Sequence, residues 1–250
     1  MNFFNSSPSA LRWSTLAAWC VVVIAAGIMG SHQTWSDSMI RQMALGFHTR
    51  GTSPVIALEL ADSKEMIADL LPATEDGGKD RDTVVTLVEW DFLFILGYTA
   101  LFLLMALRHR PSGTRTGLLI LAAAVALGDV LENLQLLAAL GRLPGWLAWI
   151  SYMPSLLWWA SSLKWMGTFT LVTCLGHMEI TLPRPDILPS VLRCMTGGLM
   201  FFGGVTGLFW AFGAGHALLI ENAFSFILAG LGILFLLFWM PDAPWKKEGA

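Results

Sequence analysis

The sequence predicts an all-helical integral membrane protein, a bundle of six transmembrane helices with a small helical extracytoplasmic cap. Hydrophobic residues make up 55% of the 250 residues and charged residues only 13%, whereas charged residues average about 25% in soluble domains. Apolar segments of about 20 residues recur along the chain, which is the length that crosses the hydrocarbon core of a bilayer. Ionisable side chains lie within several of these segments, where a charge costs roughly 2.5–3.5 kcal/mol and needs a partner inside the bundle.

Six segments have the length and apolar character of membrane spans. They cover residues 13–30, 87–107, 117–140, 155–175, 195–215 and 222–240. We interpret the first as an uncleaved helix and not as a signal peptide, because no small-residue cleavage motif precedes Ser31. Apolar residues extend back from the fourth span to Trp146, but Pro154 interrupts them. Residues 146–153 are therefore expected to form a re-entrant or interfacial lead-in.

Basic residues near the predicted span ends set the expected orientation. With a cytoplasmic N-terminus, the inside segments hold eight lysine and arginine residues and the short outside segments hold only Arg142. Such a bias places both termini in the cytoplasm. The chain then divides into 1–30 (cytoplasmic N-terminus and first span), 31–86 (extracytoplasmic loop), 87–175 (spans two to four) and 176–250 (spans five and six and the cytoplasmic C-terminus).

The long loop between the first two spans contains elements of its own. The apolar stretch after Pro54 opens either a helix or a short strand. Asp62 and Glu65 have the spacing of a capping box, and the apolar residues after them recur at helical spacing until Pro72. The polar run 73–82 is expected to be a flexible turn. The loop is thus expected to form the small helical cap on the outer membrane surface.

Polar residues of the second and third predicted spans fall on single helix faces. Asp91 lies near the outer end of the second span and Tyr98 near its middle, seven residues away, so both share one face. On the third span, Glu132 and Asn133 follow Asp129 at three and four residues and share its face. Two carboxylates one helical turn apart resist joint ionisation in a low dielectric, so we expect them to share a proton or a cation.

The fourth predicted span contributes a cation. Ser161, Lys164 and Thr168 form a polar stripe at helical spacing, with Lys164 close to the middle of the span. Consecutive spans joined by short connections are usually neighbours. The lysine side chain is therefore expected to reach Asp129 or Glu132.

These residues predict a polar intramembrane site that binds or moves a proton, a cation or a small amphiphile. The two acids of the third span would accept the proton or cation, and Lys164 would be their counter-ion. Asp91 would be the entry acid on the outer side, and Tyr98 and Asn133 would line the site with hydrogen-bonding groups. Intramembrane charges generally mark such sites.

Two other interpretations remain open. The protein could be a structural or assembly subunit in which the buried charges only hold helices together, as polar contacts between membrane helices do. It could also be a membrane enzyme acting on lipid, with the carboxylates as general acid and base. The surplus of acids over lysine favours a ligand over a balanced structural pair, and no nucleophile accompanies the acids to favour the enzyme.

Other functional classes lack their motifs. The histidines form neither HxxxH nor HExxH, and the sequence has no GxSxG, Walker or dinucleotide-binding glycine pattern. We therefore expect no catalytic residues, no cofactor and no metal. No basic patch indicates nucleic acid, and the expected partner is the lipid bilayer. Gly203 and Gly207 form a GxxxG motif that could support an oligomer, although internal packing is favoured in a multi-span protein.

Several motifs together resemble an uncharacterised family of bacterial multi-pass inner-membrane proteins. The shared features are an outer ELA segment, a DFLF…Y second span, a DxxEN third span and a lysine in the fourth span. They correspond here to Glu59, Asp91, Phe92, Tyr98, Asp129, Glu132, Asn133 and Lys164. The resemblance covers about residues 55–170 and implies a multi-pass protein of the bacterial inner membrane, with no particular activity.

Overall fold

All regular structure in the described part of the chain is helical. The computed structural model describes residues 8–36, 39, 54–59, 61, 63–72, 75–107, 113–181, 187–209, 223 and 225–233. The helices are α1 (Pro8–His32), α3 (Pro54–Glu59), α4 (Lys64–Leu70), α5 (Glu75–Leu107), α6 (Gly113–Ala139), a single 3-10 turn (Gly145–Leu147), α7 (Pro154–Thr181) and α8 (Ile187–Phe209). The predicted helical class is thus confirmed for these residues.

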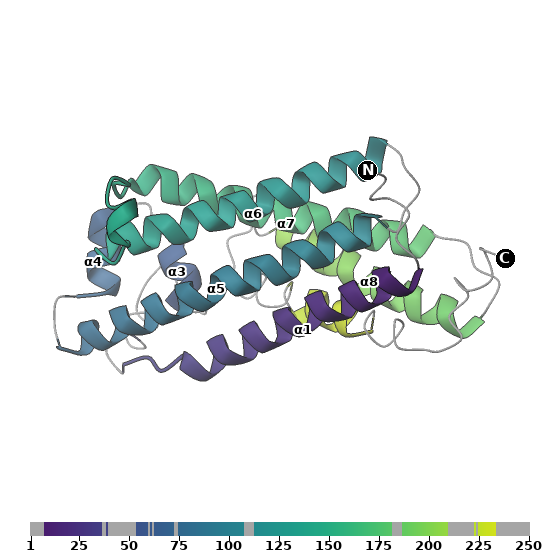
Figure 1. Cartoon of the computed structure of the whole chain (residues 1–250), viewed down its shortest axis with the longest axis horizontal. Helices are drawn as coiled ribbons and strands as arrows, with labels where there is room; N and C mark the ends of the chain where they lie inside the picture. Colours follow the sequence, from purple (N-terminus) through teal and green to yellow (C-terminus); the bar gives the residue numbers. More distant parts are fainter. Residues whose placement is uncertain are drawn as a thin grey trace.

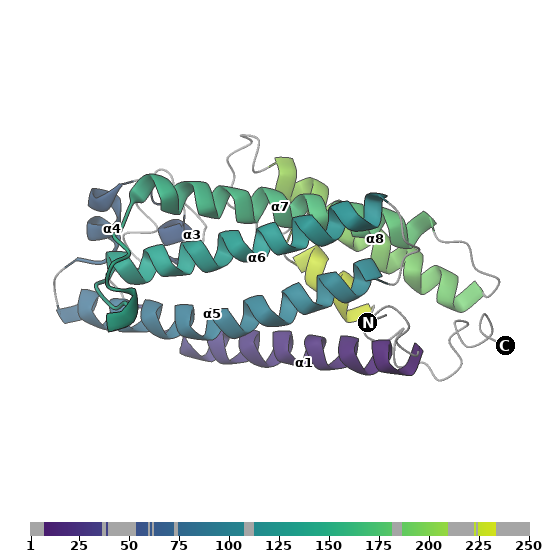
Figure 2. The ribbon, with the colours of Figure 1, turned by 45° about the horizontal axis from the view of Figure 1, so that its top comes forward.

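The long helices form an elongated bundle in which each packs on its neighbour in the chain. Helix α1 contacts α5, α5 contacts α6, α6 contacts α7, and α7 contacts α8 (Figures 1 and 2). The short helices α3 and α4 lie together at one end of the bundle, where α5 begins and α6 ends. Helix α3 also contacts α6 and α7. We call this end of the bundle the α3 end.

In the described part of the chain, four helices are long and apolar enough to cross a membrane, as in an integral membrane protein. These stretches are Trp13–His32, Gly77–Leu107, Gly113–Ala139 and Val191–Phe209. Large apolar side chains such as Leu96, Ile120 and Phe202 are exposed on them, which suits contact with lipid. Helix α7 covers the predicted fourth span but is not one of the four, because tryptophan, serine and Lys164 interrupt its apolar residues.

Within the polar run 73–82, residues 75–82 are not the flexible turn that their composition suggested, because Glu75 already begins α5; residues 73 and 74 lie outside the described part of the chain. Three contacts hold its first turns. Asp80 accepts hydrogen bonds from the Ser36 backbone amide at 2.9 Å and hydroxyl at 2.6 Å. Arg81 donates to the Leu71 carbonyl at 2.7 Å. A Cβ at Gly77 would lie 1.9 Å from the Pro72 carbonyl oxygen, so only glycine permits this close approach of the chain.

The two short helices resolve the remaining alternatives in the loop. The segment after Pro54 is a helix and not a strand. Helix α4 begins at Lys64, and the hydroxyl of Ser63 accepts a hydrogen bond from the Met66 amide at 3.2 Å. The predicted capping box at Asp62 was therefore misplaced by one residue, since Ser63 is the N-cap and a hydroxyl oxygen serves that position well.

The last two predicted spans are described only in part. Helix α8 begins at Ile187, earlier than the predicted start of the fifth span at residue 195. Of the sixth predicted span, only residues 223 and 225–233 lie within the described part. Gly203 and Gly207 take part in internal packing: an added Cβ would lie 2.8 Å from the Ala223 carbonyl oxygen at the first and 2.2 Å from the Phe169 ring at the second.

Candidate functional site

The face of α6 that carries the predicted acids is turned into the bundle. Asp129, Glu132 and Asn133 are 3%, 0% and 2% exposed, and α6 lies between α5 and α7. Gly128 allows α7 to come close, because an added Cβ there would lie 3.2 Å from the Ala160 carbonyl oxygen and 3.4 Å from the Lys164 amide nitrogen. The spacing that predicted a single polar face is thus reproduced by the packing.

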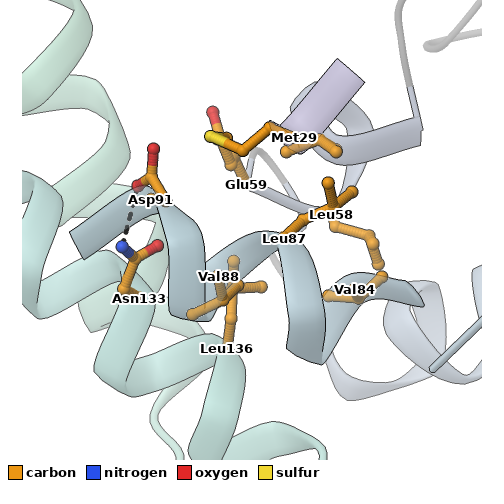
Figure 3. A pocket seen from close by; sticks show the side chains of 10 residues that line it. Met29, Leu58, Glu59, Val84, Leu87, Val88, Asp91, Asn133 and Leu136 are labelled. Atoms are coloured by element: carbon orange, nitrogen blue, oxygen red, sulfur yellow. Dashed lines mark hydrogen bonds between the residues drawn. The ribbon is translucent and has the colours of Figure 1, made fainter. Parts of the chain in front are cut away.

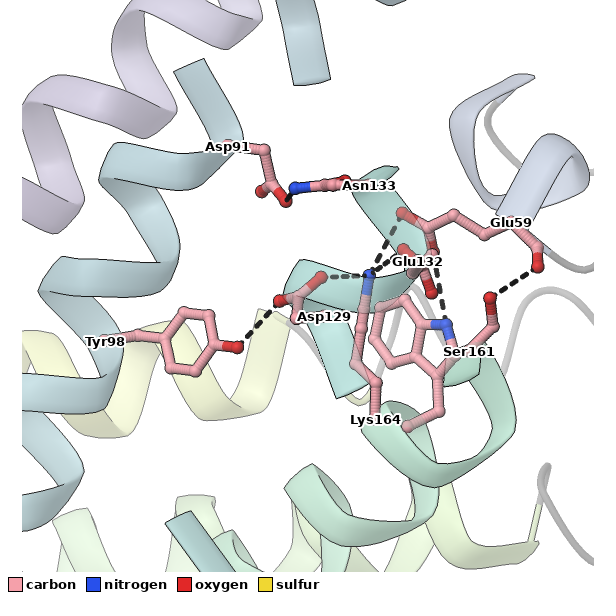
Figure 4. A network of polar contacts seen from close by, with 9 residues as sticks. Glu59, Asp91, Tyr98, Asp129, Glu132, Asn133, Ser161 and Lys164 are labelled. Atoms are coloured by element: carbon pink, nitrogen blue, oxygen red, sulfur yellow. Dashed lines mark hydrogen bonds and ion pairs between the residues drawn. The ribbon is translucent and has the colours of Figure 1, made fainter. Parts of the chain in front are cut away.

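Lys164 lies at the centre of a buried group of acids (Figure 4). Its Nζ atom is 2.6 Å from Glu132 Oε1, 3.0 Å from Asp129 Oδ1 and 3.2 Å from Glu59 Oε1. The predicted contact between Lys164 and the acids of the third span is confirmed. The ammonium also lies 4.8 Å from the centre of the Trp165 ring, a distance at which a cation is attracted to the ring face.

Helix α5 adds two further members of the predicted site. The Tyr98 hydroxyl donates to Asp129 Oδ2 at 2.7 Å, so Asp129 is held between a phenol and an ammonium. In a separate contact between the same two helices, the Asn133 side-chain amide donates to Asp91 Oδ2 at 2.8 Å. The residues predicted on α5 and α6 therefore meet, but in two separate pairs.

Sequence reasoning left Glu59 out of the candidate site. This residue ends α3, and its carboxylate contacts Lys164 and accepts a hydrogen bond from Trp165 Nε1 at 3.2 Å. Its backbone carbonyl accepts from the Ser161 hydroxyl at 2.6 Å. Burial raises the pKa of the Glu59 carboxyl, while the Lys164 charge opposes this effect and Asp129 adds to it. The sequence did contain one signal for Glu59, because it is an acidic residue in the otherwise apolar ELA segment.

We use the term Lys164 network for Lys164, Glu59, Asp129 and Glu132 with their hydrogen-bond donors Tyr98, Ser161 and Trp165. It joins α3, α5, α6 and α7. Thr168, predicted on the same stripe of α7, forms no side-chain hydrogen bond with the network among the described residues. Gln135, another buried polar residue of α6, is not part of the Lys164 network. Its side-chain oxygen accepts a hydrogen bond from the Met153 backbone amide at 2.7 Å and so positions the start of α7.

The network holds more acid than base. Three carboxylates contact one ammonium, and Asp91 lies close by with Asn133 as its partner. Glu132 Oε2 is buried and has no hydrogen-bond donor among the described residues. Repulsion between like charges in a low dielectric disfavours ionising every acid at once. The arrangement is therefore suited to holding a proton or another positive group in addition to Lys164.

A small cavity adjoins the network at the α3 end (Figure 3). Its apolar walls come from four helices, and its polar residues are Glu59, Asp91 and Asn133. The apolar lining includes Met29, Leu58, Val84, Leu87, Val88 and Leu136. Among the described residues, no group of three or more His, Cys, Asp or Glu side chains is placed to hold a metal ion.

Comparison of the chain with protein-family models, with curated proteins and with solved structures finds no match.

Proposed function

We propose that this chain is a multi-pass protein of the bacterial inner membrane in which the Lys164 network binds or moves a proton, a cation or a small amphiphile. The observation that carries the proposal is the imbalance of charge. Three buried carboxylates contact a single lysine, and a fourth carboxylate lies beside them. A purely structural ion pair needs one acid for each base, because surplus buried charge is costly.

The proposed topology has six spans, both termini in the cytoplasm and the α3 end outside. The bias of lysine and arginine in the short connecting segments supports this orientation. The position of α3 and α4 beside the first turns of α5, at one end of the bundle, supports an outer cap (Figure 1). Exposed Trp146 and Trp149 near the same end suit a membrane interface.

The contacts suggest a role for each residue. Asp129 and Glu132 accept the proton or cation, and Lys164 is the resident counter-ion that any incoming cation must compete with. Glu59 closes the network from the α3 end, because it is the acid supplied by the loop and not by a span.

Asp91 and its partner lie at the edge of the network. Asp91 faces the cavity and is the proposed entry acid. Tyr98 and Asn133 orient the carboxylates of Asp129 and Asp91 by donating hydrogen bonds. A charged species that enters the cavity would therefore meet Asp91 before it meets Lys164.

The main alternative is a structural role, favoured by the number of helices that the network joins. Direct contacts tie α3 and α6 to α7 through one ammonium. The third possibility, an enzyme acting on lipid, has no specific contact in its favour. The test must therefore distinguish a ligand-binding network from a structural one.

Infrared difference spectra of the purified protein provide that test. Spectra recorded between low and high pH, and with and without sodium or potassium, should contain a carboxyl band that responds to the change. The band should disappear in Asp129→Asn or Glu132→Gln and persist in Glu89→Gln, which removes an exposed acid on α5. If no carboxyl responds, and a folded Lys164→Met/Glu132→Leu variant still complements the deletion strain, the structural interpretation is correct.

A further inference from the structure

The cavity beside Asp91 has room for more than one water-sized group. The space open to the centre of a water-sized molecule is about 30 Å³, whereas one water needs about 10–15 Å³ by this measure. The whole empty volume of about 350 Å³ includes space that is open to solvent. The cavity can therefore hold an ammonium-sized group beside Asp91, while a hydrocarbon chain attached to that group would extend through the open side.

The polar end of this cavity is negative. Asp91 accepts one hydrogen bond, from Asn133, and no lysine or arginine in the described part of the chain lies within ion-pair distance of it. Glu59 differs, because its carboxylate already contacts Lys164 and Trp165. Asp91 is thus the cavity-lining acid that has room for an additional cation.

Most of the remaining lining is apolar, and α5 supplies three of its residues. Val84, Leu87 and Val88 lead along the helix to Asp91 (Figure 3). A metal ion prefers several oxygen ligands, and the described residues offer no such group of acids and histidines. An ammonium group attached to a short hydrocarbon chain matches both ends of the cavity, since it needs one carboxylate and apolar surface for the chain.

We propose that the cavity binds an organic ammonium ion through Asp91, with its hydrocarbon chain against Val84, Leu87 and Val88. The inference rests on the proposed function and names the ligand class of the same site. The ammonium could belong to a free alkylamine or to the ethanolamine headgroup of a membrane lipid. Both sources present the same chemistry to Asp91.

Binding of hexylammonium chloride to the full-length protein in phosphatidylcholine nanodiscs tests the proposal. Calorimetry should show saturable binding that neither sodium chloride nor neutral hexanol reproduces. Asp91→Asn should weaken the binding at least tenfold, and Val88→Phe should do the same by filling the cavity without changing its charge. The matched control is Glu89→Gln, two residues earlier on α5 and exposed, which should bind as the natural protein does.

Nanodiscs that contain phosphatidylethanolamine distinguish the two sources. If the natural ligand is the lipid headgroup, these nanodiscs should weaken hexylammonium binding by competition, and Asp91→Asn should retain less ethanolamine lipid in native mass spectra. If it is a free amine, the lipid should have no effect while hexylammonium still binds.

Equal binding by the natural protein, Asp91→Asn and Val88→Phe would overturn the assignment of the cavity. Absence of binding by both hexylammonium and ethanolamine lipid would overturn it as well. Neither result touches the proposed function, because the infrared measurement reports on Asp129 and Glu132 without any organic cation.

Discussion

The Lys164 ammonium lies 2.6 Å from Glu132 Oε1, across a place where Gly128 lets α6 and α7 approach each other. Neither residue is accessible to water to any large extent, since Glu132 is 0% and Lys164 7% exposed. The contact therefore forms only when both helices are in place. The stability of the bundle and the chemistry of the network therefore both depend on the Lys164 ammonium and the Glu132 carboxylate.

Replacing Lys164 with methionine should destabilise the protein. The change removes the ammonium that contacts Glu59, Asp129 and Glu132, and breaking a buried ion pair typically costs about 3–5 kcal/mol. Adding Glu132→Leu should recover only part of this loss, because the other two acids remain. Thermal and denaturant unfolding in detergent measure both effects. A single variant as stable as the natural protein would contradict the geometry of the network.

The pH dependence of stability should contain a contribution from Glu59. Burial raises its pKa above the ordinary value of 4.5 in the folded protein. Between these two pKa values the folded state holds the proton and the unfolded state does not. The stability from Glu59 is therefore complete below pH 4.5 and is lost as the pH rises through the folded-state pKa, by about 1.4 kcal/mol for each unit of difference.

Glu59→Gln should flatten the fall in stability with rising pH. Unfolding temperatures measured in steps from pH 4 upward would show the difference between the two curves. The matched control is Glu65→Gln, which removes an exposed acid on α4 and should follow the natural protein. Parallel curves for the natural protein and Glu59→Gln would show that the Glu59 carboxyl has the same pKa in the folded and unfolded states.

Spacing along single helices was enough to predict most of the network. Asp129, Glu132 and Asn133 had to share a face of α6 because they lie three and four residues apart. The cost of a lone charge in hydrocarbon then required a partner for Lys164, and the structure supplies it from α6. The choice of partners within the network could not be predicted, since the Asn133–Asp91 and Tyr98–Asp129 pairs depend on how α5 and α6 rotate against each other.

Contacts made by the loop were beyond the reach of sequence patterns. Glu59 lies in a helix of six residues, too short for a periodic signal, and it meets Lys164 only through tertiary packing. The charged residues 75–82 read as a turn from their composition, whereas Asp80 and Arg81 hold them in α5 through contacts with Ser36 and Leu71. In both cases packing between segments overrides the local preference.

The proposed orientation can be tested independently of any activity. Reporter fusions after His109 and at Ala250 should be active in the cytoplasm, and fusions after Gln33 and Gly141 should be active outside, because basic residues concentrate in the inside segments. Paired reporters that are active only on one side of the membrane serve as mutual controls. A C-terminus found outside would rule out an even number of spans with a cytoplasmic N-terminus.

Gly128 offers a way to separate helix packing from helix propensity. Gly128→Val should destabilise the protein by about 1–3 kcal/mol, because its Cβ would already lie 3.2 Å from the Ala160 carbonyl oxygen and the larger side chain overpacks the contact between α6 and α7. Gly117→Ala on the same helix meets nothing within 4 Å, so it should be neutral or stabilising by up to about 1 kcal/mol. Unfolding midpoints in detergent compare the two.

Because separation of α6 from α7 lengthens the contact between Lys164 and Glu132, the Gly128→Val variant should also lose the carboxyl band that responds to pH or cations, while Gly117→Ala keeps it. If Gly128→Val were as stable as Gly117→Ala and kept the band, α6 and α7 would not be packed as closely at Gly128 as the structure places them.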